Sequence, residues 1–331
     1  MSSTLTAEGP VAGNPGDAPL SSPDAAADAR ASESRALTPH CALKRVVLLH
    51  NPLSGSVGGG AGADARAIFD DYDIEAEIVP LEGDFDATIA SAFDNRPDAI
   101  FVLAGDGTAR AVAARSGPDG PLIAPLPGGT MNMLPKALYG TADWKEALRK
   151  ALEEGEPRFI SGGRVNGEAP FFCAAIFGSP ALWAPAREAM RTGKLKLAWT
   201  YARRALKRAF TGRIRYSLDG ARRKRAEALA LISPMISRAM EEPTGLEAAA
   251  MDPSDAAEAF RMAAHALFSD WRHDPSVSTR PAQRVAIGAR SRIPAVIDGE
   301  PVLLDREAMV SFIPRAFRAL TPRPPAAEDS V

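Results

Sequence analysis

Residues 99–108 read Ala-Ile-Phe-Val-Leu-Ala-Gly-Asp-Gly-Thr, an apolar run that ends in a glycine turn with one carboxylate. Such a run is typical of a buried strand, the glycines allow a tight exit, and residues 109–113 are predicted to begin a helix. A strand-to-helix turn presents unpaired backbone N–H groups to an anion, and Asp106 can hold Mg²⁺ or accept a proton from an attacking hydroxyl. The turn indicates a nucleotide phosphate site, although a four-residue match alone fits an ordinary strand-to-helix turn equally well.

Two other apolar runs end in comparable loops. Residues 45–49 lead into the loop 50–56, His-Asn-Pro-Leu-Ser-Gly-Ser, and residues 121–126 lead into the loop 127–132, Pro-Gly-Gly-Thr-Met-Asn. Ligands of an open parallel sheet bind outside the carboxyl ends of its strands, so we expect the three loops to meet. Glycine N–H groups there could bind phosphate oxygens. The side chains that could add hydrogen bonds are Asn51, Ser54, Thr108, Thr130 and Asn132.

The common phosphate-binding motifs are absent. No G-x-x-x-x-G-K-S/T stretch occurs, which excludes the usual P-loop, and the first strand is not followed by G-x-G-x-x-G.

Taken together, the motifs N-P-x-S-G, G-D-G-T and P-x-G-T-x-N resemble those of the diacylglycerol kinase catalytic-domain family, which includes bacterial lipid kinases and sphingosine and ceramide kinases. Asp298-Gly299-Glu300 is similar to a fourth family element near the C-terminus. The resemblance covers residues 44–320. It implies an α/β N-terminal domain with a parallel sheet, like those of NAD kinases and diacylglycerol kinases, followed by a mainly β C-terminal domain.

The resemblance also implies an activity and a set of site residues. The γ-phosphoryl group of ATP–Mg²⁺ would pass to a lipid hydroxyl. Asp106 would be catalytic and metal-binding, and Glu300 would be the catalytic carboxylate that faces it. The implied cofactor contacts are Asn51, Ser54, Gly55, Gly105, Gly107, Thr108, Gly128, Gly129, Thr130, Asn132, Asp298 and Gly299.

Several positions depart from the family pattern. Ala104 replaces a glycine, Ala111 stands where a glutamate is usual, and Met133 replaces a common aspartate. An acidic element that binds a structural Mg²⁺ in some bacterial members would correspond to residues 244–247, where one aspartate is missing. We therefore expect no second metal site.

The composition fits a protein of two domains that has no membrane-spanning helix. The chain has 331 residues, 46% hydrophobic and 24% charged, and a formal charge of -2, which argues against a nucleic-acid-binding protein. No uncharged apolar run reaches the roughly 18 residues of a membrane helix. The two cysteines and four histidines show no metal-ligand spacing. We expect a cytoplasmic protein, peripheral at the inner membrane surface, and leave a homodimer open.

Domain limits follow from changes in pattern. Residues 1–42, rich in Ala, Ser, Pro, Gly and Asp, are expected to form a disordered leader. The α/β domain is expected over 43–158, with crossover helices over 61–72, 85–94 and 144–154. The β-rich domain is expected over 159–305, and one of its strands is predicted over 171–176. Residues 306–322 would return to the first domain, before a tail over 323–331.

A helical insertion over 185–211 interrupts the predicted β domain. Residues 194–210 have apolar side chains at helical spacing and five basic ones opposite, and Arg213, Arg215 and residues 222–225 add positive charge. Anionic lipid headgroups attract such clusters. A solvated basic face on a core-packed helix fits the pattern equally well.

The sequence therefore favours an ATP-dependent lipid kinase with a diacylglycerol-like acceptor. Two alternatives stay open: a kinase of a soluble substrate that resembles NAD kinase, and a nucleotide-binding protein without kinase activity. The sequence does not decide which of Asp106 and Glu300 is the general base.

Overall fold

The computed structural model describes residues 37–55, 57–178, 213–237, 244–252 and 277–323. The chain divides into two units, Met1–Leu37 and Thr38–Val331, and all the elements below belong to the second. The predicted helix 194–210 and insertion 185–211 lie outside the described residues.

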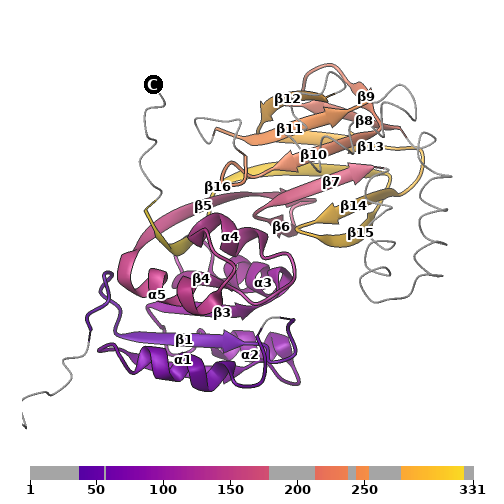
Figure 1. Ribbon diagram of the computed structural model, residues 1–331. Coiled ribbons are helices and arrows are strands. Elements are labelled where there is room, and N and C mark those ends of the chain that lie inside the picture. Colours follow the sequence, from indigo (N-terminus) through magenta and orange to yellow (C-terminus); the bar gives the residue numbers. More distant parts are fainter. Residues whose placement is uncertain (1–36, 56, 179–212, 238–243, 253–276, 324–331) are drawn as a thin grey trace, which may run out of the picture. The chain divides into compact units, whose positions relative to one another are not determined.

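The first part of the unit is a parallel sheet flanked by helices (Figure 1). The strand order is β2-β1-β3-β4, and β3 is buried over its whole length, as expected of a continuous apolar strand in a parallel sheet. The Phe69 ring from α1 packs edge-on against Phe101 of β3, with 5.4 Å between ring centroids. The strands are β1 (Arg45–His50), β2 (Glu75–Pro80), β3 (Ala99–Ala104) and β4 (Leu122–Pro127). The helices are α1 (Ala61–Phe69), α2 (Phe85–Ser91), α3 (Asp106–Ser116), α4 (Met133–Tyr139) and α5 (Trp144–Glu154).

The remainder is β-rich and confirms the expected fold class. A six-stranded antiparallel sheet has the order β12-β11-β10-β7-β14-β15. The other strands extend the first sheet beyond β4 in the order β16-β13-β8-β9, and β5 and β6 also pair there. The strands are β5 (Gly155–Val165), β6 (Ala169–Phe171), β7 (Ala174–Gly178), β8 (Ile214–Leu218), β9 (Lys224–Ala226), β10 (Ala228–Ile232), β11 (Leu246–Met251), β12 (Val277–Ala282), β13 (Arg284–Gly288), β14 (Ile293–Ile297), β15 (Glu300–Leu304) and β16 (Glu307–Pro322).

Strand β16 joins the two parts. It pairs antiparallel with β5 along most of its length, with an irregularity between Ile313 and Phe317, and it pairs in parallel with β4 at Ala319 and Ile123. Because β4 has this single pair on that side, Pro125 and Pro127 fit in the strand although proline cannot donate to a ladder. One sheet thus runs through both predicted domains, and the predicted limits within residues 43–322 stay predictions.

Two local predictions differ from the structure. The predicted strand 171–176 is divided between β6 and β7, because the N–H groups of Phe172 and Cys173 turn to the carboxylate of Asp298. The expected leader extends to residue 42, but Pro39 is buried and the His40 N–H donates to the carbonyl of Leu152 at 2.8 Å. No helix in the described part of the chain is long and apolar enough to cross a bilayer.

We expect the carboxylate of Asp98 to stabilise the first sheet at the point where β1 begins. It accepts hydrogen bonds from the N–H groups of Arg45 and Lys44 at 2.9 and 2.7 Å, and the bond from Arg45, more than any other effect, holds the pKa of this carboxyl below its ordinary value. Asp98→Ala should lower the free energy of unfolding by about 1 kcal/mol at neutral pH. A lowered folded-state pKa gives stability that is present above the unfolded value of about 3.9 and is lost as the pH falls through the folded value. The difference from wild type, measured by urea unfolding, should therefore shrink in acid.

The exposed Asp119, to which the structure gives no hydrogen bond among the described residues, provides the control. Asp119→Ala should leave stability within about 0.5 kcal/mol of wild type at every pH. A pH-independent loss for Asp98→Ala would contradict the assigned role of the charge.

Candidate active site

The glycine turn after β3 positions Asp106 as the first residue of α3. Gly105 is the extended N-cap residue and has no side chain with which to cap the helix. The Asp106 side chain instead reaches the next loop, where its Oδ2 accepts a hydrogen bond from the Asn132 N–H at 2.9 Å. Asp106 thus connects the end of β3 to the start of α4.

The two oxygens of Asp106 have different surroundings. Burial raises the pKa of this carboxyl above its ordinary value, and the N–H groups of Asn132, Met133 and Leu134 oppose that shift. Oδ1 is buried without a hydrogen-bond partner in the described part of the chain. Since buried carboxylate oxygens normally have a partner, Oδ1 fits an incoming Mg²⁺ ion or a substrate proton.

The loop 127–132 is closely packed on the glycine turn. A Cβ added to Gly128 would lie 2.6 Å from the Ala104 nitrogen, and one on Gly129 would lie 2.9 Å from the Gly105 Cα. Only glycine fits such close backbone contacts. A valine at Gly129 would therefore disturb the protein itself and would be a poor probe of phosphate binding.

Asn132 fixes the shape of this loop. Its backbone is left-handed, with a φ of 51°, a conformation that asparagine tolerates. Its Oδ1 accepts from the Gly129 N–H at 2.7 Å, and its Nδ2 donates to the Gly129 carbonyl at 2.8 Å. The Asn132 side chain is therefore already engaged within the loop.

The loop after β1 joins the other two. Asn51 Oδ1 accepts from the Leu53 N–H at 3.0 Å, and Ser54 Oγ donates to the Gly128 carbonyl at 2.7 Å. A Cβ on Gly55 would lie 3.9 Å from Thr130 Oγ1. All three loops predicted to meet are in fact neighbours, with Gly107 and Thr108 in the first turn of α3.

Glu300 reaches the same place from the β-rich part. Asp298 and Gly299, with φ values of 46° and 87°, form the two-residue turn between β14 and β15, as Asp-Gly does in type I′ hairpins. Glu300 follows directly, and a Cβ on Gly107 would collide with its carboxylate. The structure therefore brings Glu300 beside the turn that carries Asp106.

Asp298 has a structural role that the sequence did not predict. Its carboxylate accepts three hydrogen bonds, from the N–H groups of Phe172, Cys173 and Ala174, at 2.9, 2.9 and 3.0 Å. Burial, the largest effect, raises the pKa of this carboxyl, and the three N–H groups oppose the rise. These contacts fix the hairpin that positions Glu300, and the cofactor contacts assigned to Asp298 and Gly299 stay predictions.

Sequence reasoning missed Arg110, which joins α3 to this hairpin. Its Nη2 lies 2.5 Å from Glu300 Oε2, and its Nη1 donates to the Ile297 carbonyl at 3.2 Å. The helical register gave the only clue, because Arg110 lies one turn after Asp106.

Metal-ligating side chains are sparse around these loops. No group of three or more His, Cys, Asp and Glu side chains among the described residues could hold an ion. A bound Mg²⁺ would rely on Asp106 Oδ1, substrate oxygens and water, as is usual for Mg²⁺ beside phosphates.

Comparison with known proteins agrees with this geometry. Residues 45–164 match the family model described as the diacylglycerol kinase catalytic domain. This part of the chain belongs to that family. The matched segment contains Asp106 and all three loops. No curated protein sequence matches the chain.

Solved structures share the fold over more of the chain. A diacylglycerol kinase from Bacillus anthracis str. Sterne is 15% identical, with a TM-score of 0.61, and the match covers 85% of this chain and 98% of that one. A second structure of this kind from the same organism is 17% identical, with a TM-score of 0.64, and covers 86% and 99%. At these identities the likeness shows the fold alone.

The structure shows the environment of the three residues that depart from the family pattern. Ala104 is buried, and its backbone lies under Gly128. Ala111 is exposed on α3, next to Arg110. Met133, in place of an aspartate, begins α4, and its backbone N–H helps to lower the pKa of the Asp106 carboxyl. At Ala104 and Met133 the backbone therefore takes part in the contacts of the loops even though the side chain differs from that of the family.

We expect Asp298→Asn to destabilise the protein. Asparagine tolerates the left-handed backbone at this position, but it presents an NH₂ group where a carboxylate oxygen accepts a hydrogen bond. Leaving one buried N–H without an acceptor should cost about 1–3 kcal/mol, measured by denaturant unfolding. The matched control is Asp305→Asn, which changes an exposed carboxylate directly after β15 and should alter stability by less than about 0.5 kcal/mol. Equal losses in the two variants would contradict the role given to Asp298.

Proposed function

We propose that the protein is an ATP-dependent lipid kinase that transfers the γ-phosphoryl group to the hydroxyl of a diacylglycerol-like lipid. The observation that carries the proposal is the buried Oδ1 of Asp106, which has no hydrogen-bond partner among the described residues and lies in a turn that meets Glu300 at Gly107. Membership of residues 45–164 in the diacylglycerol kinase catalytic family supports phosphoryl transfer. The match does not identify the acceptor, and we propose a lipid in that role.

The chain's own groups would perform three tasks. Backbone N–H groups of the glycine loops would bind phosphate oxygens, and Asp106 Oδ1 would bind Mg²⁺, which neutralises charge on the transferring group when it is present. Asp106 or Glu300 would take the proton of the lipid hydroxyl as its oxygen bonds to the γ-phosphorus. ADP would leave as the bond between the γ-phosphorus and the β,γ-bridging oxygen breaks.

Glu300 is positioned to accept the proton of the lipid hydroxyl, although its side chain is not buried. About half of its side chain, 55%, is exposed, while Arg110 keeps the carboxylate beside Gly107. A partly exposed carboxylate can meet a substrate that arrives from outside, and Asp106, which is more buried, suits the metal. The geometry therefore favours Glu300 as the base and Asp106 as the metal ligand.

One observation favours the alternative of a nucleotide-binding protein without kinase activity. The Glu300 carboxylate already pairs with Arg110, and Ala111 stands where the family usually has a glutamate. Pure protein incubated with labelled ATP and a total lipid extract separates the alternatives. A labelled lipid supports the proposal, label on a soluble metabolite alone supports an NAD-kinase-like enzyme, and ATP binding without product supports the non-catalytic protein.

Removing either charge should lower turnover. Asp106→Asn and Glu300→Gln keep side-chain size but lose the charge needed to bind metal or accept a proton, so each should lower kcat by about 10²–10⁴-fold. Because burial raises the pKa of Asp106, kcat/KM for ATP should fall in acid with a midpoint above the ordinary value of about 3.9. Glu153→Gln, at the distant end of α5, is the control and should keep wild-type turnover. Near-wild-type turnover of Asp106→Asn would overturn the assignment.

Arg110 should act by positioning Glu300. Arg110→Gln removes the charged partner, so we expect kcat to fall by about tenfold or more with little change in KM for ATP. Arg110→Lys should restore part of the loss. Arg115→Gln on the same helix is the control, because the Arg115 guanidinium lies over the Phe93 ring instead. Higher activity in Arg110→Gln would show that the ion pair restrains Glu300.

A further inference from the structure

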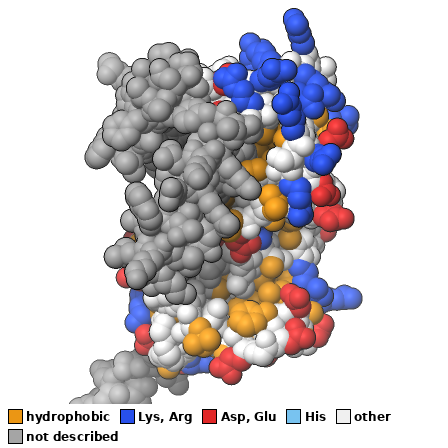
Figure 2. Space-filling view, turned by 90° about the vertical axis from the view of Figure 1, so that its right-hand side faces the viewer, with side chains coloured by type: hydrophobic (Ala, Val, Ile, Leu, Met, Phe, Trp, Pro, Cys, Tyr) orange, Lys and Arg blue, Asp and Glu red, His pale blue; other side chains and the backbone are white. Residues whose placement is uncertain are grey.

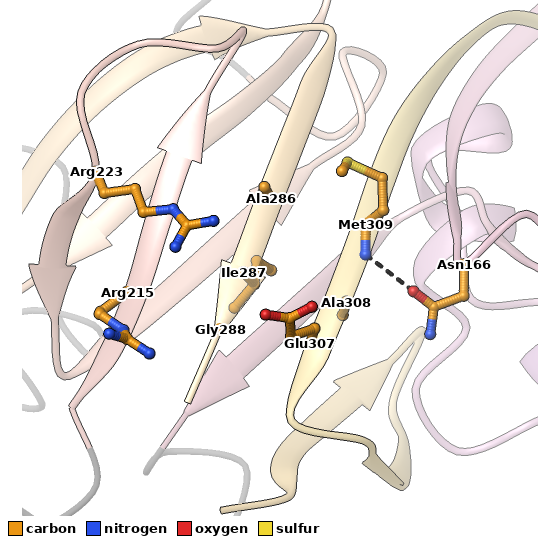
Figure 3. Close-up of a pocket in the computed structure, with 9 residues that line it drawn as sticks. All are labelled: Asn166, Arg215, Arg223, Ala286, Ile287, Gly288, Glu307, Ala308 and Met309. Atoms are coloured by element: carbon orange, nitrogen blue, oxygen red, sulfur yellow. Dashed lines mark hydrogen bonds between the residues drawn. The ribbon is translucent and has the colours of Figure 1, made fainter. Parts of the chain in front are cut away.

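A groove lies on the extended sheet away from the loops described above. Its volume is about 300 Å³, and its lining comes from β8, β13, β16, the residue after β5 and the residue before β9. It shares no residue with the three loops or with the Asp298 hairpin. Arg215 and Arg223 lie on one side of the groove, Glu307 and Asn166 on the other, and Ala286 and Gly288 between them (Figure 3).

Strand register explains the form of the groove. Gly288 of β13 lies opposite Arg215 of β8 on one side and opposite Glu307 of β16 on the other. Directly opposite residues share a face of the sheet, so these three form one row. Neighbouring strands are about 4.8 Å apart, which separates the Arg215 and Glu307 backbones by about 10 Å, and a glycine fills the middle of the row. The missing side chain leaves room for a ligand between the two walls.

The two arginines of the groove keep their positive charge without a neutralising carboxylate in the described part of the chain. Neither Arg215 nor Arg223 has a carboxylate partner among the described residues, whereas the nearby Arg213 lies 2.5 Å from Asp252. Arg225 of β9 lies directly opposite Arg215, and like charges so placed destabilise a strand pair. The space-filling view shows Lys and Arg side chains gathered toward the top, where β8 and β9 lie in Figure 1 (Figure 2). An anionic ligand would remove this repulsion.

The opposite wall has polar and apolar groups. Asn166 Oδ1 accepts from the Met309 N–H at 2.9 Å, which leaves its NH₂ group for another partner. Met309 is 52% exposed and lines the groove. With two arginines and one glutamate, the lining carries a net charge of +1, which matches the single negative charge of a phosphodiester. The Glu307 carboxylate can accept hydrogen bonds from headgroup hydroxyls.

We propose that this groove binds the phosphodiester headgroup of an anionic membrane phospholipid and so docks the protein on a bilayer. Arg215 and Arg223 bind the phosphate, Glu307 and Asn166 bind headgroup hydroxyls, and the exposed Met309 faces the lipid. The basic residues that follow Ala221 add attraction to the charged surface. The site does not depend on phosphoryl transfer and goes beyond the proposed function.

Vesicle co-sedimentation of the full chain tests the proposal. Wild-type protein should bind phosphatidylcholine vesicles that contain phosphatidylglycerol, and should not bind phosphatidylcholine alone. Each basic residue near an anionic surface contributes about fivefold in affinity, so Arg215→Gln with Arg223→Gln should weaken binding about 30-fold. Arg149→Gln with Arg158→Gln, an exposed pair on α5 and β5, is the control with equal charge loss and should change binding less than about threefold. Equal losses in the two pairs, or no wild-type binding, would overturn the proposal.

A second variant separates the groove from general surface charge. A Cβ on Gly288 would meet only the Arg306 carbonyl, at an ordinary 3.9 Å, so isoleucine fits the strand and fills the groove without changing the charge. Gly288→Ile should lose vesicle binding while its melting temperature stays near that of wild type. Retained binding would overturn the headgroup site.

Two further measurements identify the source of the phosphate and separate the two proposals. Glycerophosphoglycerol, a soluble phosphodiester without acyl chains, should displace the protein from vesicles only at concentrations far above that of the accessible lipid, because it offers the groove contacts without the charged surface. Displacement at similar concentration would show that the groove takes a free phosphate compound and would overturn membrane docking. ATP turnover on detergent-dispersed lipid should be unchanged in the groove variants. An inactive wild type would overturn the kinase proposal alone, since vesicle binding is read without turnover.

Discussion

The arrangement of the site depends on one strand that pairs with both parts of the molecule. β16 lies antiparallel to β5 and also meets β4 at Ala319, so the sheet that carries the glycine loops continues into the β-rich part. The second sheet packs on that extension through a core that includes Phe171, Phe177 and Val310. Through this packing β14 and β15 present Glu300 to the start of α3. The proposed kinase centre, assembled from two sheets, would need such a continuous connection, because a displacement of about 1 Å can cost a hundredfold in rate.

Within the site, backbone contacts do most of the positioning and side chains add charge. Gly128 and Gly129 lie against the backbone of Ala104 and Gly105, the Asn132 N–H donates to Asp106, and the N–H groups of the first residues of α4 lower the pKa of that carboxyl. This explains how Ala104 and Met133 can replace the usual family residues, since the contacts at these positions are made by main-chain atoms. Ala111 is different, because a missing carboxylate cannot be replaced by backbone. Arg110, which holds Glu300 from the same helix, is the charged contact that the structure offers there.

Much of the fold could be predicted from the sequence because local patterns decide it. The continuous apolar run of β3, the glycines after it and the apolar spacing in α5 each predict one element. Contacts between distant residues left no such pattern. Asp298 was grouped with the cofactor residues because it is part of a motif, whereas its carboxylate binds three N–H groups more than 120 residues away. The pair of Arg110 and Glu300 spans 190 residues, and only the folded chain shows it.

The two proposed anion-binding arrangements lie at different places along one sheet and would depend on different physical interactions. Around Asp106, phosphate would meet oriented N–H groups that are partly buried, where salt screens little and exact placement matters. At the other edge, Arg215 and Arg223 are exposed guanidinium groups on flexible stems, whose attraction is screened by salt and requires a dense anionic surface. Rigid backbone suits a reaction that must align a phosphorus atom with a hydroxyl, and mobile positive charge suits reversible contact with a bilayer. The proposed transfer to a lipid would need both, because the nucleotide would come from water and the acceptor from a membrane.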